Sequence, residues 1–571
     1  MRYLVLACDF DGTLATDGTV RDETFAALQR LRESGRKLIL VTGREIDDLL
    51  KVFPPVEIFD RVVAENGALL YRPANREYKT LGEAPSAGFV QALRAAGISP
   101  LSVGHCIVST WQPHESKVLE TIRDLGLELQ VIFNKGAVMI LPSGVNKATG
   151  LEAALLELGL SPHNCVGVGD AENDHALIRL SECGVAVGNA LPLVQERADW
   201  VTPGRNGEGV VQLIDKLLEN DLADLEDRLS RHFIPIGTPT NGEEVRLDPH
   251  GLAVLVAGSS GSGKSTFATG VLERLAGQGY QFCIVDPEGD YALFEGIIVL
   301  GDKERPPTVA GVLEVLEQPN RNAVVNLLGL ALAERPAFFS RLLPGLQDLR
   351  SRTGRPHWIV VDEAHHLLPA PSDLVSVTLP RTLSGMMLIT VHPEHVSPAV
   401  LGSIDVVIAI GRSADQTLRA FGEAVGEHPP AALPATTGPG EALLWRRRPE
   451  AREPVGIRTL PPRSEHRRHV RKYATGELGE DKSFYFRGQD GQLNLRAQNL
   501  ALFIQLADGV DDETWLHHLR SGDYSRWFRE AIKDEGLAAE AVGVESQTGL
   551  DPRESRELIK AAIERRYTMP S

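Results

Sequence analysis

The sequence contains few cysteines and few aromatic residues. Only five of its 571 residues are cysteine, and no two of them form a C-x-x-C pair. We therefore expect neither a disulfide framework nor a thiolate zinc site, which fits a protein of a reducing compartment. Aromatic residues make up only 6% of the chain, so it offers little material for the stacking surfaces that bind single-stranded nucleic acids.

Long apolar runs are also missing. No uninterrupted apolar stretch reaches the roughly 18 residues that a membrane-spanning helix needs. The apolar run at residues 3–8 is followed by two aspartates, which is typical of neither a signal peptide nor a membrane anchor. The formal net charge of −18 disfavours nucleic acid unless positive charge is concentrated locally. We expect a cytoplasmic protein without a membrane partner.

The chain does have the length and composition of a folded multidomain protein. It is 43% hydrophobic and 24% charged, close to the averages of globular domains. At roughly 100–200 residues per domain, its length predicts about three to five domains.

Strands and helices alternate over residues 1–215, which predicts a parallel β-sheet covered by helices. Between about 82 and 143 the pattern changes to short antiparallel strands, with a hairpin around Asn134-Lys135-Gly136. We expect this segment to form a small α/β cap inserted into the first domain.

The rest of the chain predicts a second α/β domain and a smaller helical one. Five apolar runs between residues 235 and 447 indicate another mostly parallel sheet. Aromatic and leucine residues recur at helical spacing in the last 90 residues, where they are expected to form a core. The expected segments are a helical connector at 216–234, an α/β domain at 235–447, a basic linker at 448–482 and a helical domain at 483–571.

Two carboxylates, Asp9 and Asp11, directly follow the first apolar strand in the motif DFDGT. A pair at this spacing can share Mg²⁺, which prefers oxygen ligands, and face one phosphoryl group. One carboxylate can attack phosphorus and form an aspartyl-phosphate. The other can give a proton to the leaving oxygen and take one from water. The motif therefore predicts a magnesium-dependent phosphoryl-transfer site.

Further polar residues follow in an order that fits the same site. Thr42 and Gly43, in LVTGR at the end of the second strand, can bind phosphate oxygens. Lys147, in GVNKATG, can compensate phosphate charge. Asp170 and Asp174, in GDAEND after another apolar strand, can complete the metal site.

These four motifs resemble those of the haloacid dehalogenase superfamily of phosphohydrolases. AENGALLY at 64–71 and the inserted cap resemble subclass IIB, typified by Cof-like, sucrose-phosphate and archaeal phosphoglycolate phosphatases. The resemblance implies a Rossmann-like core in which Asp9 is the nucleophile and Asp11 the general acid/base. It also implies that Asp174 orients Lys147 or the water shell of the metal.

A capped site in this superfamily implies a small phosphorylated metabolite as substrate, because the cap excludes polymers and water. Phosphoglycolate and sugar phosphates are the expected classes. Asn66 and His105 are candidates for reading the substrate, with structural roles as the alternative.

A second motif, GSSGSGKST at 258–266, lies between an apolar strand and a helix. This is the context in which a P-loop wraps backbone N–H groups around the phosphates of a nucleotide. Lys264 would reach the outer phosphates and Ser265 would bind Mg²⁺. The expected ATP-binding residues are Gly258, Ser259, Gly261, Ser262, Gly263, Lys264, Ser265 and Thr266.

Two acids, Asp362 and Glu363, end a later apolar strand. Asp362 would hold Mg²⁺, and Glu363 would polarise the attacking water, which favours ATP hydrolysis over reversible phosphoryl transfer. Residues 362–365 also spell a helicase box, but we find no other helicase motif in the sequence.

The segment FCIVDPEGDYALFEG, together with the P-loop and the acidic pair, resembles the ring-forming HerA/FtsK ATPases. That resemblance implies a homo-oligomer. It departs at His392, which stands where the family usually has glutamine, so sensing of the γ-phosphate and cycling driven by DNA are in doubt. Arg412 is a candidate arginine finger, with an ordinary surface residue as the alternative.

The sequence analysis thus favours a phosphatase of small phosphate esters fused to an ATPase. Two alternatives stay open. One is a nucleic-acid end-processing phosphatase with a P-loop kinase, which the cap, Glu363 and the net acidity disfavour. The other is a DNA-binding ATPase motor whose phosphatase domain serves as a sensor. It is motivated by ten basic residues at 446–472, which could instead contact an acidic helix or only solvent.

Overall fold

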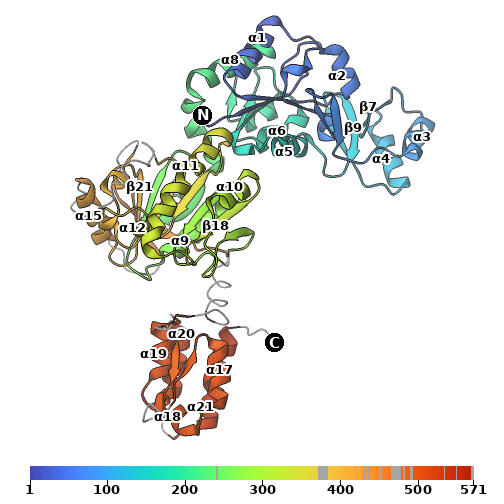
Figure 1. Cartoon of the computed structure of the whole chain (residues 1–571). Helices are drawn as coiled ribbons and strands as arrows, with labels where there is room; N and C mark the ends of the chain where they lie inside the picture. The colour runs from blue at the N-terminus through green and yellow to red at the C-terminus, as the bar shows by residue number, and fades with distance from the viewer. Residues whose placement is uncertain are drawn as a thin grey trace. The chain divides into compact units, whose positions relative to one another are not determined.

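The computed structural model forms two compact units, Met1–Leu460 and Pro461–Ser571 (Figure 1). The residues that it describes are 1–239, 242–292, 294–370, 383–427, 433, 438, 440–448, 453–463, 473, 478–479, 482–488, 493–532, 534–547 and 549–567. The first unit contains two large sheets, each with its own core, and the second unit is a small domain.

The first sheet has eight strands in the order β12-β11-β10-β1-β2-β3-β4-β5. Its strands are β1 (Val5–Cys8), β2 (Lys37–Val41), β3 (Arg61–Ala64), β4 (Leu69–Arg72), β5 (Glu77–Thr80), β10 (Cys165–Gly169), β11 (Cys183–Ala186) and β12 (Trp200–Val201). The central strand β1 pairs in parallel with β10 and β2, and only β4 runs antiparallel to the other strands. The carboxyl ends of β1, β2 and β10 therefore meet at one edge of the sheet.

Helices cover both faces of this sheet. Its helices are α1 (Asp22–Glu33), α2 (Ile46–Val52), α5 (Lys147–Glu157), α6 (His175–Leu180), α7 (Pro192–Arg197) and α8 (Gly207–Asn220). Leu6 and Cys8 of β1 join a core with α1 and α8, whereas Val5 and Ala7 join a core with α5 and α6. Burial on both faces explains why the strand is an unbroken apolar run in the sequence.

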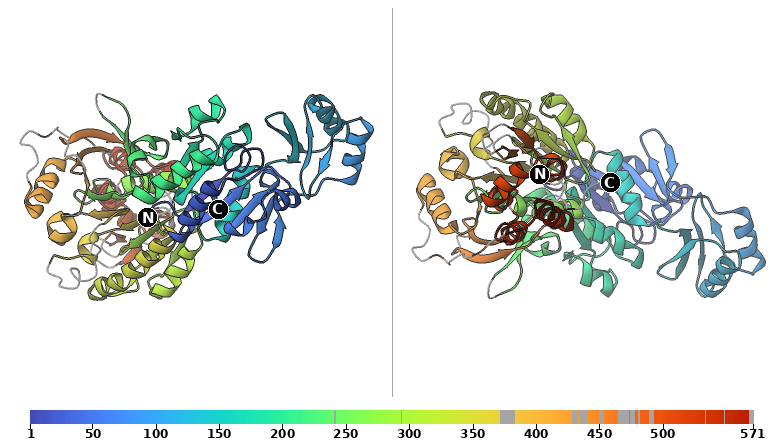
Figure 2. Two further views of the ribbon diagram at one scale, coloured as in Figure 1. Left: turned by 90° about the horizontal axis from the view of Figure 1, so that it is seen from above. Right: turned by 90° about the horizontal axis from the view of Figure 1, so that it is seen from below.

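The inserted cap is a four-stranded antiparallel sheet with the order β6-β7-β9-β8 and two helices. Its elements are α3 (Ala87–Ala95), β6 (Ser102–Val103), β7 (Val108–Trp111), α4 (Glu115–Asp124), β8 (Leu129–Asn134) and β9 (Ala137–Pro142). Ile140 packs with α3 and α4, whereas the alternate residues Met139 and Leu141 pack toward the core domain. Figures 1 and 2 show the cap as a separate lobe with its helices on the outer face.

The hairpin predicted within the cap is confirmed, because β8 and β9 pair from Leu129–Pro142 to Asn134–Ala137. The two turn residues, Lys135 and Gly136, have φ values of 47° and 90°. These values fit a type I′ turn, whose twist matches that of the strands it joins.

The second sheet has eleven strands in the order β14-β13-β23-β22-β21-β15-β20-β19-β16-β18-β17. Its strands are β13 (Ile234–Pro239), β14 (Val245–Leu247), β15 (Ala253–Ala257), β16 (Phe282–Asp286), β17 (Ile297–Leu300), β18 (Asn322–Asn326), β19 (Trp358–Val361), β20 (Met386–Thr390), β21 (Val406–Ile410), β22 (Glu441–Arg446) and β23 (Val455–Thr459). All five apolar runs predicted as strands are present, and they pair in parallel. The α/β fold class is therefore confirmed.

Helices also cover both faces of the second sheet. They are α9 (Lys264–Gly277), α10 (Val309–Glu317), α11 (Arg335–Thr353), α12 (Ala364–Leu367), α14 (Pro398–Leu401) and α15 (Ala414–Val425). The buried side of α9 packs on one face, and α10, α11 and α15 pack on the other. The layers place the P-loop, between β15 and α9, at the carboxyl edge of the sheet.

Two segments differ from the expected connector and linker. In the connector at 216–234, α8 ends at Asn220 and two 3₁₀ turns follow, whose Leu222 and Leu225 are buried in the first core. In the linker at 448–482, Val455–Thr459 forms β23, which pairs with β22 and β13. Ile457 is buried there, so a single apolar residue within a basic stretch anchors the strand. Residues 464–472 of the linker lie outside the described residues.

The described part of the second unit contains a two-stranded hairpin followed by helices. Its elements are β24 (Phe484–Phe486), β25 (Leu495–Ala497), α17 (Leu500–Gly509), α18 (Asp512–Arg520), α19 (Asp523–Glu530), α20 (Glu535–Glu545) and α21 (Pro552–Arg566). The predicted aromatic core is confirmed, because Phe503, Trp515 and Phe528 are buried. The hairpin was not predicted, since two strands of three residues leave no alternation to detect.

The five cysteines are all buried and unpaired. Within the described part of the chain, no helix is both long enough and apolar enough to cross a membrane.

Candidate functional site

The first constellation is assembled at the carboxyl ends of β1 and β10. Asp9 follows β1 and Asp170 follows β10, while the 3₁₀ turn Glu172–Asp174 brings Asp174 beside them. Carboxylate oxygens of Asp9, Asp170 and Asp174 lie within 4.8 Å of one another, and all three residues are buried. Such a group of oxygens fits a hard divalent cation.

Lys147 lies against this group. It is the first residue of α5, which Asn146 and Thr149 cap with reciprocal hydrogen bonds. Its Nζ donates to Asp9 Oδ1 at 2.5 Å and to Asp174 Oδ1 at 2.6 Å. The three carboxylates are faced by two ammonium groups, that of Lys147 and, at Asp170, that of Lys135, so an excess of negative charge remains for a cation. The residues present therefore fit Mg²⁺.

Asp174 is held in place from the backbone. Its Oδ2 accepts hydrogen bonds from the N–H groups of Asp170 and Ala171, both at 2.9 Å. Its other oxygen, Oδ1, accepts from Lys147. This is the contact by which Asp174 is expected, from the family resemblance, to orient Lys147. Gly169 accommodates it, because a Cβ there would lie 2.5 Å from the Asp174 side chain.

Electrostatics at the site follow from its burial. Burial raises the pKa of Asp9, the nearby Asp174 charge raises it further, and Lys147 opposes both effects. Burial alone would lower the pKa of Lys147, but the charges of Asp174 and Asp9 together raise it. A cation among the carboxylates would favour the ionised form of Asp9.

Asp11 is not part of this buried trio. Its half-exposed carboxylate pairs with Arg44, with Nε–Oδ2 and Nη2–Oδ1 distances of 2.7 Å. Arg44 also donates to Asp48 at 2.6 Å. No role was predicted for Arg44, although it lies within the motif LVTGR. Because Arg44 comes two residues after Thr42, at the end of a strand, the sequence could have identified it as a site residue.

Thr42 and Gly43 follow β2 beside the trio. Thr42 is fully buried, and its hydroxyl accepts the backbone N–H of Arg44 at 3.1 Å. Gly43 faces the cap, where an added Cβ would come within 2.8 Å of Met139 Cε. A side chain at position 43 would require the end of the Met139 side chain to move.

Asn66 and His105, the two candidates for substrate recognition, have different surroundings. Asn66 is fully buried with φ 54°, and its Oδ1 accepts from Asn173 Nδ2 at 2.9 Å. His105 donates its backbone N–H to the buried carboxylate of Glu65, and its ring lies against Tyr78. Glu65 also accepts the N–H groups of Cys106 and Ile107, so it anchors the cap.

A cavity of about 700 Å³ lies next to the trio. Asp11, Asn189 and four basic residues are among those that line it. The basic residues are Arg21, Arg44, Lys135 and Arg205. The sequence analysis did not anticipate Lys135 in this place, because it comes from the cap hairpin.

The second constellation surrounds the P-loop. Gly258, Gly261 and Gly263 have φ values of 154°, 75° and 102°, a conformation that L-residues rarely adopt. A Cβ at Gly258 would lie 2.3 Å from the carbonyl oxygen of Ile410. Lys264, the first residue of α9, is largely buried and donates to the Ser259 carbonyl at 3.0 Å. Ser265 and Thr266 follow it in the first turn.

Asp362 and Glu363 follow β19, two strands from the P-loop strand β15. Burial raises the pKa of Asp362 well above its usual value, and the neighbouring charges of Asp286 and Glu363 add to this. Burial also raises the pKa of Glu363, whose φ is 43°. The charge of Lys264 opposes that rise.

His392 follows β20 and is half-exposed. Its Nδ1 lies 3.0 Å from Glu394 Oε1, and its ring is 5.7 Å from that of His365. A cavity of about 350 Å³ beside the P-loop is lined by His392 together with Ser259 and Gln416. Arg412 follows β21 and is exposed.

A third cluster joins the two large domains at Glu182, between α6 and β11. Its fully buried carboxylate accepts hydrogen bonds from Arg2 (2.8 Å), His163 (2.7 Å), His250 (2.9 Å) and Tyr280 (3.2 Å). Arg2 and His163 belong to the first sheet's domain, and the other two belong to the second. Burial alone would raise the pKa of Glu182, but His250 and His163 lower it well below its usual value.

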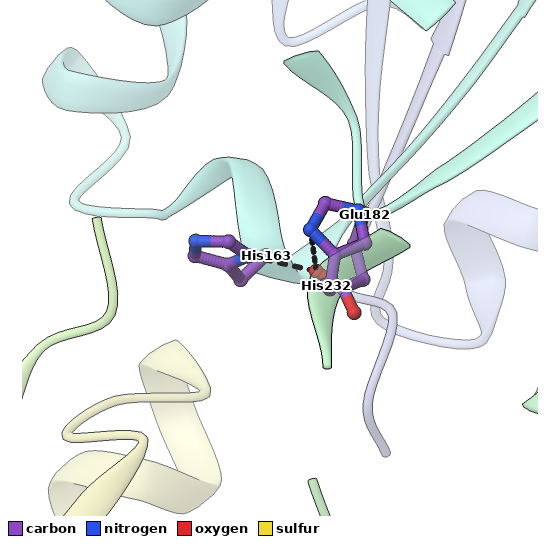
Figure 3. Close-up of side chains that lie close together, drawn as sticks. All are labelled: His163, Glu182 and His232. Atoms are coloured by element: carbon purple, nitrogen blue, oxygen red, sulfur yellow. Dashed lines mark hydrogen bonds and ion pairs between the residues drawn. The ribbon is translucent and has the colours of Figure 1, made fainter. Parts of the chain in front are cut away.

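Figure 3 shows His163, Glu182 and His232 side by side, with potential ligand atoms within 4.8 Å of one another. Because Glu182 already accepts four hydrogen bonds, its carboxylate is satisfied by protein donors, and these donors bridge the two domains. His163 extends the bridge, since its Nε2 lies 2.8 Å from the carbonyl oxygen of Gln278 just beyond α9. The helix that starts at the P-loop is thereby fixed to the first domain. No single segment of sequence signals this cluster.

Residues 6–84 and 101–214 match the model of the haloacid dehalogenase-like hydrolase family, and residues 234–336 match that of the central domain of the helicase HerA. Phosphoglycolate phosphatase of Methanothermobacter thermautotrophicus is 31% identical over 223 residues, 98% of its length and 37% of this chain. Phosphoglycolate phosphatase 2 of Saccharolobus solfataricus is 31% identical over 94% of its length and 38% of this chain. A haloacid dehalogenase-like hydrolase of Bacteroides thetaiotaomicron has a solved structure with a TM-score of 0.34 and 20% identity, covering 99% of that chain and 38% of this one.

The fold and the first site thus define a phosphohydrolase domain, joined in one chain to a HerA-like P-loop domain. The chain belongs to the haloacid dehalogenase-like hydrolases.

Proposed function

We propose that the first domain hydrolyses a small phosphate monoester, phosphoglycolate or a sugar phosphate, through an aspartyl-phosphate on Asp9. The observation that carries this proposal is the contact of Lys147 with both Asp9 and Asp174, in a buried trio at the ends of adjacent parallel strands. The phosphoglycolate phosphatases that match this domain support the choice of substrate class.

We assign each residue of the site a role in this reaction. A carboxylate oxygen of Asp9 attacks phosphorus, and the bond from phosphorus to the leaving oxygen breaks. Asp11 gives its proton to that oxygen, and then takes one from the water that hydrolyses the aspartyl-phosphate. In this role Asp11 exchanges its contact with Arg44 for one with the leaving oxygen. Lys147 balances charge on the phosphoryl group, and Thr42 and Gly43 bind its oxygens.

Asp9, Asp11, Asp170 and Asp174 are the residues proposed to hold Mg²⁺, directly or through its waters. When bound, the cation supplies charge neutralisation between the nucleophile and the phosphoryl group.

The test is phosphate release with Mg²⁺ from phosphoglycolate, sugar phosphates, an aryl phosphate and a 3′-phosphorylated oligonucleotide. We expect Asp9→Asn to abolish release from the small esters, because the amide cannot act as the nucleophile. Asp47→Asn is the matched control, since Asp47 is exposed on α2 and should leave the rate unchanged. Full activity of Asp9→Asn would refute the assignment. Activity on the oligonucleotide alone would establish the end-processing alternative.

We propose further that the second domain binds and hydrolyses ATP. The P-loop from Gly258 to Thr266 would hold the phosphates, and Ser265 and Asp362 would hold Mg²⁺. Glu363 would polarise the attacking water. The positive φ values of the loop glycines and the place of the acidic pair after β19, two strands from β15, support this proposal.

Two variants separate binding from hydrolysis. Lys264→Ala should abolish binding of a fluorescent ATP analogue, because it removes the charge that faces the outer phosphates. Glu363→Gln should bind ATP normally and lower turnover by roughly 100-fold or more, the usual scale for an activating group. Normal turnover in Glu363→Gln would show that another residue activates the water.

The HerA match favours one competing function, an ATPase motor driven by DNA. The net charge of −18 and His392 argue against it. We expect ATP turnover to be unchanged by DNA at low salt. A rise that disappears with added salt would establish the motor function.

Light scattering of the full chain, with and without ATP, would test whether the protein forms a homo-oligomer.

A further inference from the structure

The cap reaches the phosphatase site through Lys135 at the tip of the β8–β9 hairpin. Its Nζ lies 2.5 Å from Asp170 Oδ2, and its backbone N–H donates to Glu172 Oε2 at 3.3 Å. The Asp170 side chain is fully buried, whereas that of Lys135 is 46% exposed. A flexible side chain from the cap therefore contacts the innermost part of the site.

The core domain makes room for this contact at Gly12, in the DFDGT motif. A Cβ on Gly12 would lie 2.4 Å from Asp170 Oδ2 and 2.5 Å from Lys135 Nζ. Gly12 has φ 85°, and its carbonyl accepts from Asn189 Nδ2 at 2.8 Å. The glycine thus leaves space for the lysine and the carboxylate to meet.

Lys135 and a divalent cation would compete for Asp170. The carboxylate belongs to the trio that fits Mg²⁺, and an ammonium group at hydrogen-bond distance from the same oxygen would repel the cation. Because the lysine side chain is long and half-exposed, it can move away from Asp170. The cavity of about 700 Å³ that it already lines is the available space.

Basic residues outnumber acidic ones in the lining of that cavity, with Arg21, Arg44, Lys135 and Arg205 against Asp11, Asp17 and Glu208. Arg21 and Arg205 also line it, and neither side chain has a hydrogen-bond or ion-pair partner among the residues described. Arg44 lines it as well, and pairs with Asp11. An anionic group entering the cavity would meet these cations and would compete with Asp11 for Arg44.

We propose that Lys135 is a specificity-determining residue that binds a second anionic group, carried by the alcohol part of the substrate. Cation binding at Asp170 releases the lysine for this role. The substrate is accordingly a phosphate monoester that bears a carboxylate or a second phosphate. This inference rests on the proposed phosphatase function and narrows its substrate class.

The first experiment measures Mg²⁺ binding to the nucleotide-free full chain by calorimetry, so it does not depend on activity. Removing the competing ammonium in Lys135→Met should tighten Mg²⁺ binding by about fivefold, the scale of a partly exposed charge interaction. Lys135→Arg keeps the charge and should bind like the wild type. Lys117→Met is the matched control, because Lys117 is an exposed cap lysine outside the cavity. Unchanged affinity in Lys135→Met would overturn the release step.

The second experiment compares kcat/KM for phosphoglycolate, a sugar bisphosphate and glycerol phosphate, whose alcohol part is neutral. In Lys135→Met, activity on the preferred anionic ester should fall about tenfold relative to glycerol phosphate, and Lys135→Arg should restore part of it. The carboxylate and bisphosphate arms identify which anion is bound. An equal loss on all esters would mean that Lys135 only holds the cap closed, which overturns the specificity role.

Failure of the phosphatase proposal can be distinguished from failure of the proposal that Lys135 binds a second anion. If the wild type hydrolyses none of the esters, the phosphatase proposal fails, while the Mg²⁺ titration still tests the competition at Asp170. If the wild type is active and prefers glycerol phosphate, the phosphatase function stands and the second anion is refuted.

Discussion

Lys147 and Lys264 are each the first residue of a helix, but their ammonium groups have different partners. Lys147 contacts two buried carboxylates, Asp9 and Asp174, which belong to the same catalytic set. Lys264 donates to a carbonyl of its own loop, Ser259. The acids that complete its site come from a strand that follows about 100 residues later in the chain.

This difference fits two modes of phosphate recognition, one at a carboxylate that would accept a phosphoryl group and one at a loop that would bind a nucleotide. In the proposed phosphatase reaction the protein supplies the nucleophile, so we expect a cation to be held against the attacking carboxylate before the substrate arrives. In the second site the loop supplies backbone N–H groups, and the lysine has to reach a ligand that brings its own charge. The comparison predicts that the two lysines are needed for separate reactions.

The largest effects should come from replacing each lysine and measuring both the phosphatase and the ATPase activity. Lys147→Ala should lower phosphatase kcat by about 1,000-fold, because it removes the charge facing the phosphoryl group and the nucleophile. ATP turnover should be unaffected. Lys264→Ala should do the reverse, and thermal unfolding of both variants controls for folding. Loss of both activities in either folded variant would mean that the sites work as one.

The smallest effect should come from the bridge between the two domains. Glu182→Gln removes the negative charge that four donors share, and should lower the free energy of unfolding of the first unit by about 2 kcal/mol at pH 7. Both activities should remain. Differential scanning calorimetry on the full chain would measure the shift.

The pH dependence of this shift has a definite sign. The pKa of Glu182 is lower in the folded state than the value of about 4.3 in an unfolded chain. The stabilisation is therefore fully present above that value and is lost as the pH falls through the folded pKa. The difference between wild type and Glu182→Gln should be constant near neutrality and shrink below about pH 4. A difference that fails to shrink below about pH 4 would contradict the assignment of this stabilisation to the ionised Glu182.

The sequence allowed prediction of the two sheets and of most residues at the two sites. Strands such as β1, β15 and β19 are buried on both faces, so they are continuous apolar runs with polar residues just beyond their ends. Parallel pairing then brings those ends together, which is how Asp9 and Asp170 meet.

Contacts across domains were not predictable in this way. Lys135 reaches Asp170 from a hairpin tip, and the partners of Glu182 lie at positions 2, 163, 250 and 280. No local period or motif links such positions. Strand β23 was missed because one buried isoleucine among basic residues gives too weak an alternation.

The most direct test of the account is to trap the phosphorylated enzyme. The full chain would be mixed with Mg²⁺ and its best phosphate ester, quenched in acid within one turnover and analysed by peptide mass spectrometry. The account predicts a phosphoryl group on Asp9 in the wild type and none in Asp9→Asn. A phosphoryl group on Asp11, or rapid turnover with no phosphorylated peptide, would contradict it.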